Sequence, residues 1–325
     1  MNWEKYVRSV EPYVPGEQPK SRGIIKLNTN ECPYPPSKKV KRALRKIDDK
    51  KLRLYPDPQA TELVETLADY YDVKKEQVFV GVGSDDVLAM AFLTFFNSKK
   101  PILFPDITYS FYDVWAELYR IPYERIPLDE NFKINVEDYD RDNGGIVIAN
   151  PNAPTGLMTG REEIEKILKA NKDSVVIVDE AYVDFGADSC VPLIEKYDNL
   201  LVVQTFSKSR AMAGMRIGFA IGDKKLIQYM LDAKFSFNSY TMNFPSLELG
   251  VASVKDDRYF KETVQKVINT REWTKIQLRE LGFTFPDSKT NFIFATHKHV
   301  PAKELFEMLK KEKILKSASG YITLR

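Results

Sequence analysis

The chain has 325 residues, of which 43% are hydrophobic, and it carries 48 Lys and Arg against 46 Asp and Glu. This hydrophobic content excludes a disordered chain, and the length is enough for one large domain and a smaller one. A formal charge of only +2 gives little general attraction to nucleic acid or membrane, so we expect binding at a defined site.

Cysteine and histidine are too sparse and too scattered to build a disulfide framework or a metal site. Cys32 and Cys190 lie far apart, and no acidic or cysteine cluster accompanies His297 and His299. The N-terminus has no apolar signal core, and no apolar run is long enough to cross a bilayer. These features predict a soluble, cytoplasmic protein without a metal.

Short apolar runs alternate with helical segments from about residue 78 to 222. Such alternation predicts a mainly parallel sheet flanked by helices, which is an α/β fold. The predicted strands are Val78–Val80, Ile102–Phe104, Ile146–Ala149, Val175–Val178, Leu200–Val203 and Gly218–Ile221.

Helix boundaries are indicated at a few positions. Thr159 and Glu162 have the spacing of a capping box, which predicts that a helix begins there. A long amphipathic helix is predicted over about 256–282, with Phe260, Val264, Val267 and Ile268 on one face and Gly282 at its end. Downstream we predict a strand over Thr290–Thr296, a helix over Ala302–Lys311 and the start of another strand at Tyr321–Leu324.

The domain division follows from these changes in pattern. Six prolines within residues 1–36 exclude a helix there and predict an arm that lies over the rest of the chain. Beyond the arm we expect a large α/β domain over 37–250 and a smaller α+β domain over 251–325, to which the arm is joined.

Polar residues follow the predicted strands where open α/β sheets bind their ligands. Val175–Val178 leads into Asp179 and Tyr182, and a carboxylate buried at that point needs a partner. Taken alone, Asp179 would more simply cap a helix or pair with an arginine.

The next predicted strand leads into Thr205, Ser207 and Lys208, followed by Arg216. A lone lysine is most often a solvated surface charge, so its spacing to Arg216 carries the information. A lysine close to an arginine and an imine loses proton affinity and forms a Schiff base more readily. The Arg216 guanidinium suits a phosphate dianion.

Glycines and free amides follow Val78–Val80 in the run Gly81-Val82-Gly83-Ser84-Asp85, ahead of a helical pattern. A helix N-terminus of this kind binds anions. The run is neither a GxGxxG fingerprint nor a Walker loop, and by itself Ser84 could simply be a cap. Together, a phosphate cup, a carboxylate, a tyrosine and an amine are what pyridoxal phosphate requires.

Four further motifs occur in an order that a known family shares: Leu27-Asn28-Thr29-Asn30-Glu31-Cys32-Pro33-Tyr34, Leu54-Tyr55-Pro56-Asp57-Pro58, Gly83-Ser84-Asp85 and Thr108-Tyr109-Ser110. Over nearly its whole length the sequence resembles the class II, fold-type I pyridoxal-phosphate-dependent aminotransferases, and specifically the histidinol-phosphate aminotransferase family. The resemblance implies a large domain with a mainly parallel sheet and a smaller α+β domain.

The resemblance also implies residue roles around the cofactor ring. Lys208 would form the Schiff base, Asp179 would keep the pyridine nitrogen protonated, Tyr182 would hydrogen-bond the ring hydroxyl, and Tyr109 would stack on the ring. Lys208, once displaced by the substrate amine, would move a proton in a ping-pong transamination. The residues implied for the phosphate are Ser84, Asp85 through its backbone, Thr205, Ser207 and Arg216, with Tyr55 from the second subunit of a homodimer.

Three positions depart from the family pattern. Relatives often carry Asn immediately before Pro-Thr-Gly, where this chain has Ala153 and offers Asn152 one step earlier. Either Asn152 substitutes, which we prefer, or Tyr182 acts alone. Lys316 stands where relatives often place an arginine near the substrate phosphate, and Arg325, the last residue of the sequence, matches an arginine that binds the substrate's acidic group.

The amino donor implied by the resemblance is L-histidinol phosphate, with 2-oxoglutarate as acceptor. We assign Tyr13, Asn30, Lys316 and Arg325 to the substrate, with Tyr109 beside them. A threonine-phosphate decarboxylase-like enzyme and an aromatic amino acid aminotransferase remain alternatives.

A function of another class would be nucleic-acid or membrane binding through the basic segment 37–53. Against it, Val40, Ala43, Leu44 and Ile47 recur at helical spacing. The basic residues are therefore more simply the solvated face of one packed helix.

Overall fold

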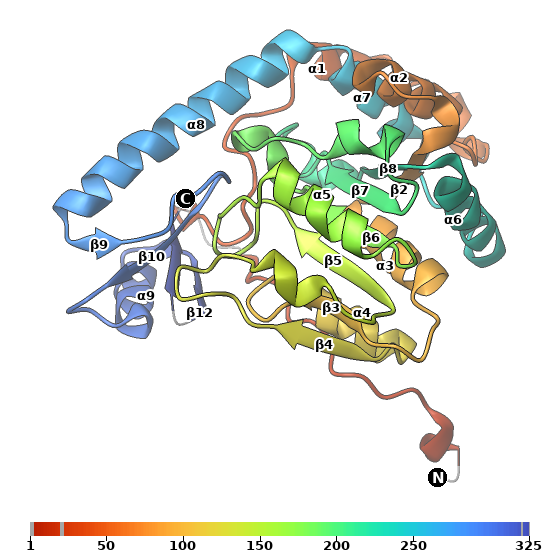
Figure 1. Ribbon diagram of the computed structural model, residues 1–325. Helices are drawn as coiled ribbons and strands as arrows, with labels where there is room; N and C mark the ends of the chain where they lie inside the picture. The colour runs from red at the N-terminus through yellow and green to blue at the C-terminus, as the bar shows by residue number, and fades with distance from the viewer. Residues whose placement is uncertain (1–2, 20–22, 320, 325) are drawn as a thin grey trace.

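The computed structural model describes residues 3–19, 23–319 and 321–324. Its main feature is a seven-stranded sheet in which β8 alone runs antiparallel to its two neighbours, so the prediction of a mainly parallel α/β sheet is confirmed (Figure 1). β4 is an edge strand that the sequence patterns did not indicate. The order across the sheet is β2 (Val78–Gly81), β8 (Gly218–Gly222), β7 (Leu200–Thr205), β6 (Val176–Asp179), β5 (Gly145–Ala149), β3 (Ile102–Pro105) and β4 (Tyr123–Ile126).

Both faces of this sheet are covered, which explains why its central strands read as continuous apolar runs. Successive side chains of a strand point to opposite faces, and Ile146 and Ile148 accordingly pack on one side while Val147 packs on the other. The first side is covered by α2 (Thr61–Tyr71), α5 (Arg161–Ala170) and α7 (Phe244–Val254), and the second by α3 (Ser84–Phe95), α4 (Phe111–Tyr119) and α6 (Lys224–Phe237).

The capping box of α5 lies one residue later than predicted. The Gly160 N–H donates to Glu163 Oε2 at 2.7 Å, and the helix begins at Arg161. Thr159 is unavailable as a cap because its N–H donates to Asn150 Oδ1 at 2.9 Å and its carbonyl accepts from Asn150 Nδ2 at 3.0 Å. The prediction of a Thr159–Glu162 box is therefore wrong.

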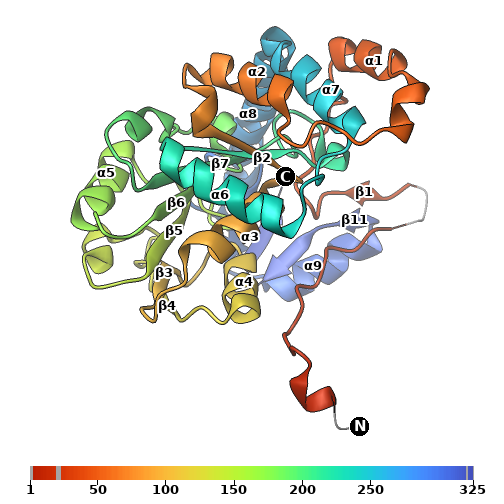
Figure 2. The ribbon, with the colours of Figure 1, turned by 90° about the vertical axis from the view of Figure 1, so that its right-hand side faces the viewer.

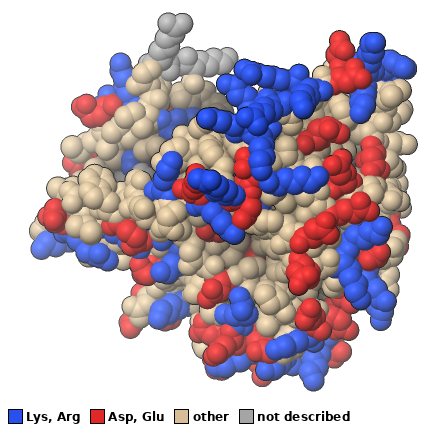
Figure 3. All heavy atoms as spheres, turned by 90° about the horizontal axis from the view of Figure 1, so that it is seen from above, with Lys and Arg blue, Asp and Glu red and all other residues tan. Residues whose placement is uncertain are grey.

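The basic segment 37–53 forms two short helices, so the prediction of one packed helix is wrong. α1 (Lys38–Arg45) is capped by Ser37 and buries Val40 against α7, and a 3-10 turn follows over Asp49–Arg53. Leu44 is 55% exposed and does not share the buried face. Figure 3 shows Lys and Arg gathered on one part of the face seen from above, with Asp and Glu spread over much of the remainder.

The C-terminal part of the chain is built on the long helix α8 (Asp257–Glu280). As predicted, Gly282 follows its end with a φ of +83°, and Phe260, Val264, Val267 and Ile268 pack in one cluster. A four-stranded sheet of order β12-β13-β10-β9 follows, and it packs against α9 (Ala302–Lys311), whose bounds are those predicted. Its strands are β9 (Phe283–Thr284), β10 (Ile293–His297), β12 (Ser317–Ser319) and β13 (Tyr321–Leu324).

β10 begins three residues later than predicted, because hydroxyl side chains fold the preceding residues into a turn. Ser288 Oγ and Thr290 Oγ1 both donate to the carbonyl of Phe292, at 2.5 and 3.0 Å. The N-terminal arm also reaches this region, since β1 (Ile25–Lys26) pairs in parallel with β11 (Ile314–Leu315) (Figure 2). The domain boundaries at residues 36 and 250 stay predictions.

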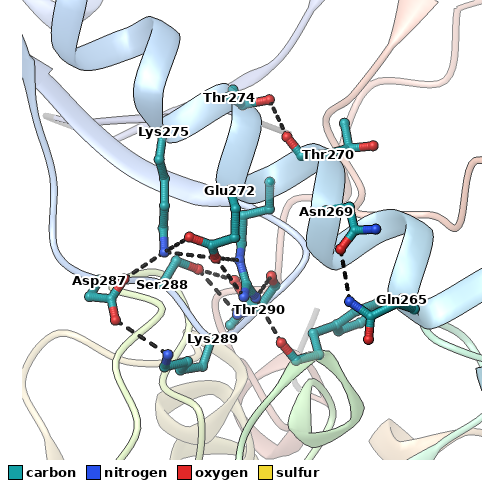
Figure 4. Close-up of polar contacts among 12 residues, drawn as sticks. Gln265, Asn269, Thr270, Glu272, Thr274, Lys275, Asp287, Ser288, Lys289 and Thr290 are labelled. Atoms are coloured by element: carbon teal, nitrogen blue, oxygen red, sulfur yellow. Dashed lines mark hydrogen bonds and ion pairs between the residues drawn. The ribbon is translucent and has the colours of Figure 1, made fainter.

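Two buried cations fix α8 to its surroundings (Figure 4). Lys275, only 2% exposed, donates to Glu272 Oε1 at 3.0 Å and to Asp287 Oδ1 at 2.5 Å. Arg271 donates to the carbonyl of Phe185 at 2.7 Å. The helix is thereby tied both to the loop before β10 and to the segment after β6.

Close backbone packing joins the start of β8 to the turn before α3. A Cβ on Gly218 would lie 2.3 Å from both the carbonyl carbon of Gly83 and the amide nitrogen of Ser84. These contacts are with backbone atoms, which cannot move aside as a flexible side chain could.

We therefore expect Gly218→Ala to lower the free energy of unfolding by about 3 kcal/mol, as overpacking of a rigid site does. The matched control is Gly214→Ala in the preceding loop, where an added Cβ meets nothing within 4 Å and the change should stay below about 0.5 kcal/mol. Urea unfolding of both variants measures the difference, and equal stabilities would contradict the packing argument.

Candidate active site

The carboxyl end of β6 carries a buried acid. Asp179, the last residue of that strand, is 5% exposed, and its carboxylate accepts from Tyr112 Oη at 2.8 Å and from the Ala181 N–H at 3.2 Å. Burial raises the pKa of Asp179 to about 6, although the two hydrogen bonds and the charge of Lys208 act in the opposite direction.

Lys208 lies on the loop after the neighbouring strand, β7. Its Nζ donates to the carbonyl of Thr29 at 3.0 Å and lies 5.5 Å from the centre of the Tyr182 ring. No ion pair joins Lys208 to any residue in the described ranges. A lysine amine at this position is chemically able to form a Schiff base with a carbonyl group.

Three strand ends meet beside this loop. The sheet register places Thr205 opposite Gly218 and Gly218 opposite Gly81, so β7, β8 and β2 contribute adjacent residues. Thr205 and Ser207 are both buried, and the Ser207 N–H donates to Thr205 Oγ1 at 3.2 Å. These three strand ends therefore place the hydroxyl groups of Thr205 and Ser207 on one side and the start of α3 on the other.

That helix start is α3, whose first residue is Ser84 and whose N-cap is Gly83. Gly83 has a φ of +88°, and a Cβ there would lie 2.5 Å from Arg216 Nη2. Glycine thus allows the Arg216 guanidinium to lie against the helix N-terminus, where Nη2 is 3.3 Å from Asp85 Oδ2. Free amides and a guanidinium together form an anion-binding cup.

Aromatic side chains border the cup. Tyr109 donates through Oη to Asp85 Oδ1 at 3.0 Å, and burial raises its pKa. The Tyr13 ring stacks on Phe111 at 4.2 Å. Burial, followed by the charges of Asp85 and Tyr182, raises the pKa of Tyr13, which places this arm residue beside the same groups.

Asn152 is held entirely by protein groups. Its amide nitrogen donates to the carbonyl of Ile107 at 2.8 Å and to Thr155 Oγ1 at 3.1 Å, and its oxygen accepts from Thr108 Oγ1 at 2.8 Å. The side chain joins the loop after β3 to the turn after β5.

Asn30, from the arm, has a φ of +54° and donates through Nδ2 to Tyr182 Oη at 3.0 Å. Its carbonyl accepts from Asn291 Nδ2 at 3.0 Å. Asn30 therefore connects Tyr182 to Asn291, which lies just before β10 of the C-terminal sheet.

Comparison with known proteins assigns this arrangement to a family. The model of the family described as aminotransferase class I and II matches residues 22–324. A histidinol-phosphate aminotransferase of Lactococcus lactis subsp. lactis is 52% identical over 97% of this chain and 88% of the relative. The chain belongs to the histidinol-phosphate aminotransferase family, within the class I and II aminotransferases.

Two solved structures show how widely the fold is shared. The histidinol-phosphate aminotransferase of Sinorhizobium meliloti in complex with pyridoxal-5'-phosphate aligns with a TM-score of 0.84 at 20% identity, covering 93% of this chain and 86% of that one. The L-threonine-O-3-phosphate decarboxylase of Porphyromonas gingivalis aligns with a TM-score of 0.77 at 21% identity, covering 93% and 94%. At such identities the likeness shows the fold alone.

Tyr55, Lys316 and Arg325 were also assigned to the site of the aminotransferase from the sequence. Tyr55 is 82% exposed, with its ring 4.6 Å from that of Tyr240. Lys316 is half-buried between β11 and β12, and burial lowers its pKa to about 8. Arg325 lies outside the described residues.

Two contacts escaped the sequence reasoning. Tyr112, which donates to Asp179, lies in the first turn of α4, three residues after Tyr109. Thr29, whose carbonyl accepts from Lys208, acts through its backbone and left no side-chain signal.

Among the described residues no group of three or more His, Cys, Asp or Glu could hold a metal ion. No helix in the described part of the chain has the length and apolar character needed to cross a bilayer.

The raised pKa of Asp179 predicts a pH-dependent cost to stability. Between the unfolded value of 3.8 and the folded value of about 6 the native state holds a proton that the unfolded state has released. Stability from this group is therefore lost as pH rises through that window.

We expect Asp179→Asn to gain stability relative to the wild type by roughly 3 kcal/mol between pH 4 and pH 7.5, because about two pKa units correspond to that energy. Urea unfolding of both cofactor-free proteins at the two pH values measures the change. Any pH-independent cost of replacing the carboxylate is the same at both pH values and cancels when they are compared. If the stability difference between the variant and the wild type does not change with pH, Asp179 is not desolvated.

Proposed function

We propose that this aminotransferase moves the amino group of L-histidinol phosphate to 2-oxoglutarate in a ping-pong reaction that uses pyridoxal 5'-phosphate. The observation that carries the proposal is that Lys208, the buried Asp179 and the Arg216 cup lie on the same edge of the sheet. The identity of 52% to a named histidinol-phosphate aminotransferase supports the substrate.

The residues present fit this cofactor. Gly218 lets β8 pack against the turn before α3, and Gly83 lets the Arg216 guanidinium lie against the α3 N-terminus, so backbone amides and a guanidinium are held together, which suits a phosphate. The buried Asp179 suits a protonated ring nitrogen, since each charge would stabilise the other. When bound, pyridoxal phosphate supplies an electron sink for the substrate carbon. The residues that would hold its phosphate are Ser84, Asp85 through its backbone, Thr205, Ser207 and Arg216.

Lys208 would hold the cofactor covalently and, once freed by the substrate amine, would act as the general base. Its Nζ is held at the site by a 3.0 Å hydrogen bond to the Thr29 carbonyl and lies 5.5 Å from the centre of the Tyr182 ring. The substrate Cα proton would pass to that nitrogen and then onward.

We assign the ring hydroxyl to Tyr182, with Asn30 as the residue that orients the phenol. Both residues are joined by the 3.0 Å hydrogen bond from Asn30 Nδ2. Asn152, which the sequence analysis preferred as the substitute for the Asn missing at position 153, already donates both amide hydrogens to Ile107 and Thr155, and this supports the alternative in which Tyr182 acts alone. Tyr109 would stack on the ring, as the motif that contains it implies.

The substrate would lie between the arm and the segment after β11. We propose that Tyr13 borders it, that the Lys316 ammonium binds its phosphate, and that Arg325 binds the acidic group of the acceptor. Burial leaves Lys316 with a pKa of about 8, so an anion that reaches this site would find a charged partner below that pH.

A second copy of the chain would complete the site. Leu52, Leu54, Tyr55, Phe237 and Tyr240 are all exposed, and such exposed apolar side chains are typical of an interface. We propose a homodimer in which Tyr55 reaches the phosphate of the partner's site. A cytoplasmic enzyme without nucleic-acid or membrane partners agrees with the near-neutral charge.

Borohydride reduction of the holoenzyme should attach the cofactor irreversibly to Lys208, and peptide mapping would identify the labelled residue. Lys208→Ala should lower kcat by at least about 10³-fold, because it removes both the nucleophile and the base. Lys224→Ala, an exposed lysine of α6, is the control and should keep full activity. Label on any other lysine would refute the assignment.

The same kinetics separate the alternatives. Formation of a new amino acid from 2-oxoglutarate identifies transamination, whereas release of carbon dioxide from threonine phosphate would identify decarboxylation. Turnover of aromatic amino acids in preference to histidinol phosphate would reassign the donor.

Lys316→Met should raise the KM for histidinol phosphate by about 10- to 100-fold, because a charge-assisted hydrogen bond is lost. Lys316→Arg should retain most of the affinity. In the wild type, affinity for the phosphorylated donor should fall as pH rises through about 8, where free Lys316 becomes neutral. Histidinol, which lacks the phosphate, is the control substrate, and an equal KM change with it would argue against this role.

A further inference from the structure

Lys234, near the end of α6, is a buried cation that the proposed mechanism does not use. It is 3% exposed, and its Nζ, which has no ion pair within the described residues, donates to the carbonyl of Pro58 at 2.9 Å. Burial lowers the pKa of Lys234, although the charges of Asp86 and Asp57 act in the opposite direction.

An ammonium in this position is unfavourable, because burial removes its hydration. The ring of Phe79 in β2, whose centre lies 5.6 Å from Lys234 Nζ, offers only a weak cation–π contact. A methionine side chain would fill the same space without losing hydration, so packing alone does not account for a lysine. What the ammonium adds is the hydrogen bond to Pro58.

Pro58 ends the segment 55–58, which presents Tyr55 at the surface. The two prolines of this segment lack an N–H and have a restricted φ, so the segment is stiff but has few backbone donors with which to fix itself. Side chains fix it instead. The Asp57 carboxylate accepts from the Thr61 N–H at 2.7 Å, and the α6 ammonium holds the Pro58 carbonyl.

The chain that follows α6 contacts the same segment. The ring of Tyr240 lies 4.6 Å from the ring of Tyr55, which is itself 82% exposed. Tyr55 is thus placed from one stretch of chain in two ways, by Tyr240 directly and by Lys234 through Pro58.

We propose that Lys234 is a positioning residue for the active site of the partner subunit: its hydrogen bond to Pro58 holds Tyr55 in the direction that meets the cofactor phosphate of the second copy. The inference rests on the proposed function, in which Tyr55 reaches that phosphate across the dimer. A subunit that lacks the ammonium therefore weakens the site of its partner and leaves its own site intact.

A rival role would lie within one subunit. Asp86, whose charge acts on Lys234, accepts from the Val82 N–H at 2.9 Å in the turn that leads into the anion cup. If this electrostatic contact were the one that matters, loss of the ammonium would weaken the cup of its own chain. Within the described structure Lys234 forms a hydrogen bond with Pro58 and no ion pair with Asp86, which favours the effect on the partner.

Lys234→Met should raise the dissociation constant of the homodimer for pyridoxal phosphate by about tenfold, because Tyr55 would no longer be held where it donates to the phosphate. The imine absorbance of the diluted holoenzyme measures this constant. Lys225→Met, at an exposed position of α6, is the matched control and should leave it unchanged. An unchanged constant for Lys234→Met would overturn the proposal.

Two heterodimers that carry the same pair of substitutions separate the two roles. The first joins a Lys208→Ala subunit to a Lys234→Met subunit, and the second joins a subunit with both substitutions to a wild-type subunit. Each retains one lysine at position 208, so all imine absorbance reports a single site. We expect wild-type cofactor affinity in the first and about tenfold weaker affinity in the second, because only there does the altered segment face the remaining Lys208.

The reverse order would place the effect within one subunit and overturn the proposal, as would equal affinities. Failure of chains with Lys234→Met to enter either heterodimer would show that the lysine is needed for folding, which also overturns it. The same two heterodimers built with Tyr55→Phe test the shared site itself. An effect of Tyr55→Phe across the dimer, with none of Lys234→Met, rejects only the role of Lys234. No effect of Tyr55→Phe in either heterodimer rejects the shared site of the proposed function and the positioning role with it.

Discussion

The arrangement of the site depends on one buried carboxylate at the end of a central strand. Asp179 is buried where β5, β6 and β7 run side by side, and among the described residues its carboxylate accepts hydrogen bonds from Tyr112 and the Ala181 amide in place of water. Two hydrogen bonds do not offset the desolvation, as the raised pKa shows. A positively charged ring nitrogen of a cofactor would neutralise the buried carboxylate. The protein without the cofactor is less stable because this charge is buried, and binding of the cofactor would recover that stability.

Residues that follow strand ends were the part of the site accessible from the sequence. Asp179 ends β6, Lys208 lies on the loop after β7, and Arg216 precedes the antiparallel β8, so strand direction brings all three positions to one edge. The local sequence pattern gave one wrong prediction, the helix cap at Thr159. The Asn150 side chain forms hydrogen bonds with the backbone N–H and carbonyl of Thr159, and α5 begins one residue later than predicted.

Contacts between distant parts of the chain could not be read in the same way. Asn30 and Asn291 are separated by 261 residues, and their hydrogen bond exists only because the arm, α8 and β10 pack together. Neither residue follows a strand end of the main sheet. Similarly, the burial of Lys275 depends on the loop that carries Asp287. Such polar contacts are set by tertiary packing, which periodicity does not encode.

The reversed direction of β8 has a consequence for how the enzyme can vary. A parallel return after β7 would need a crossover of a dozen or more residues, usually a helix, between Lys208 and the next strand. The antiparallel β8 instead returns through residues 206–217 without crossing a face of the sheet, so Lys208 and Arg216 lie on one connection whose two ends are fixed by sheet pairing. The distance between the amine and the anion cup is therefore a property of loop length, and insertions that enlarge or diversify the enzyme are confined to other loops.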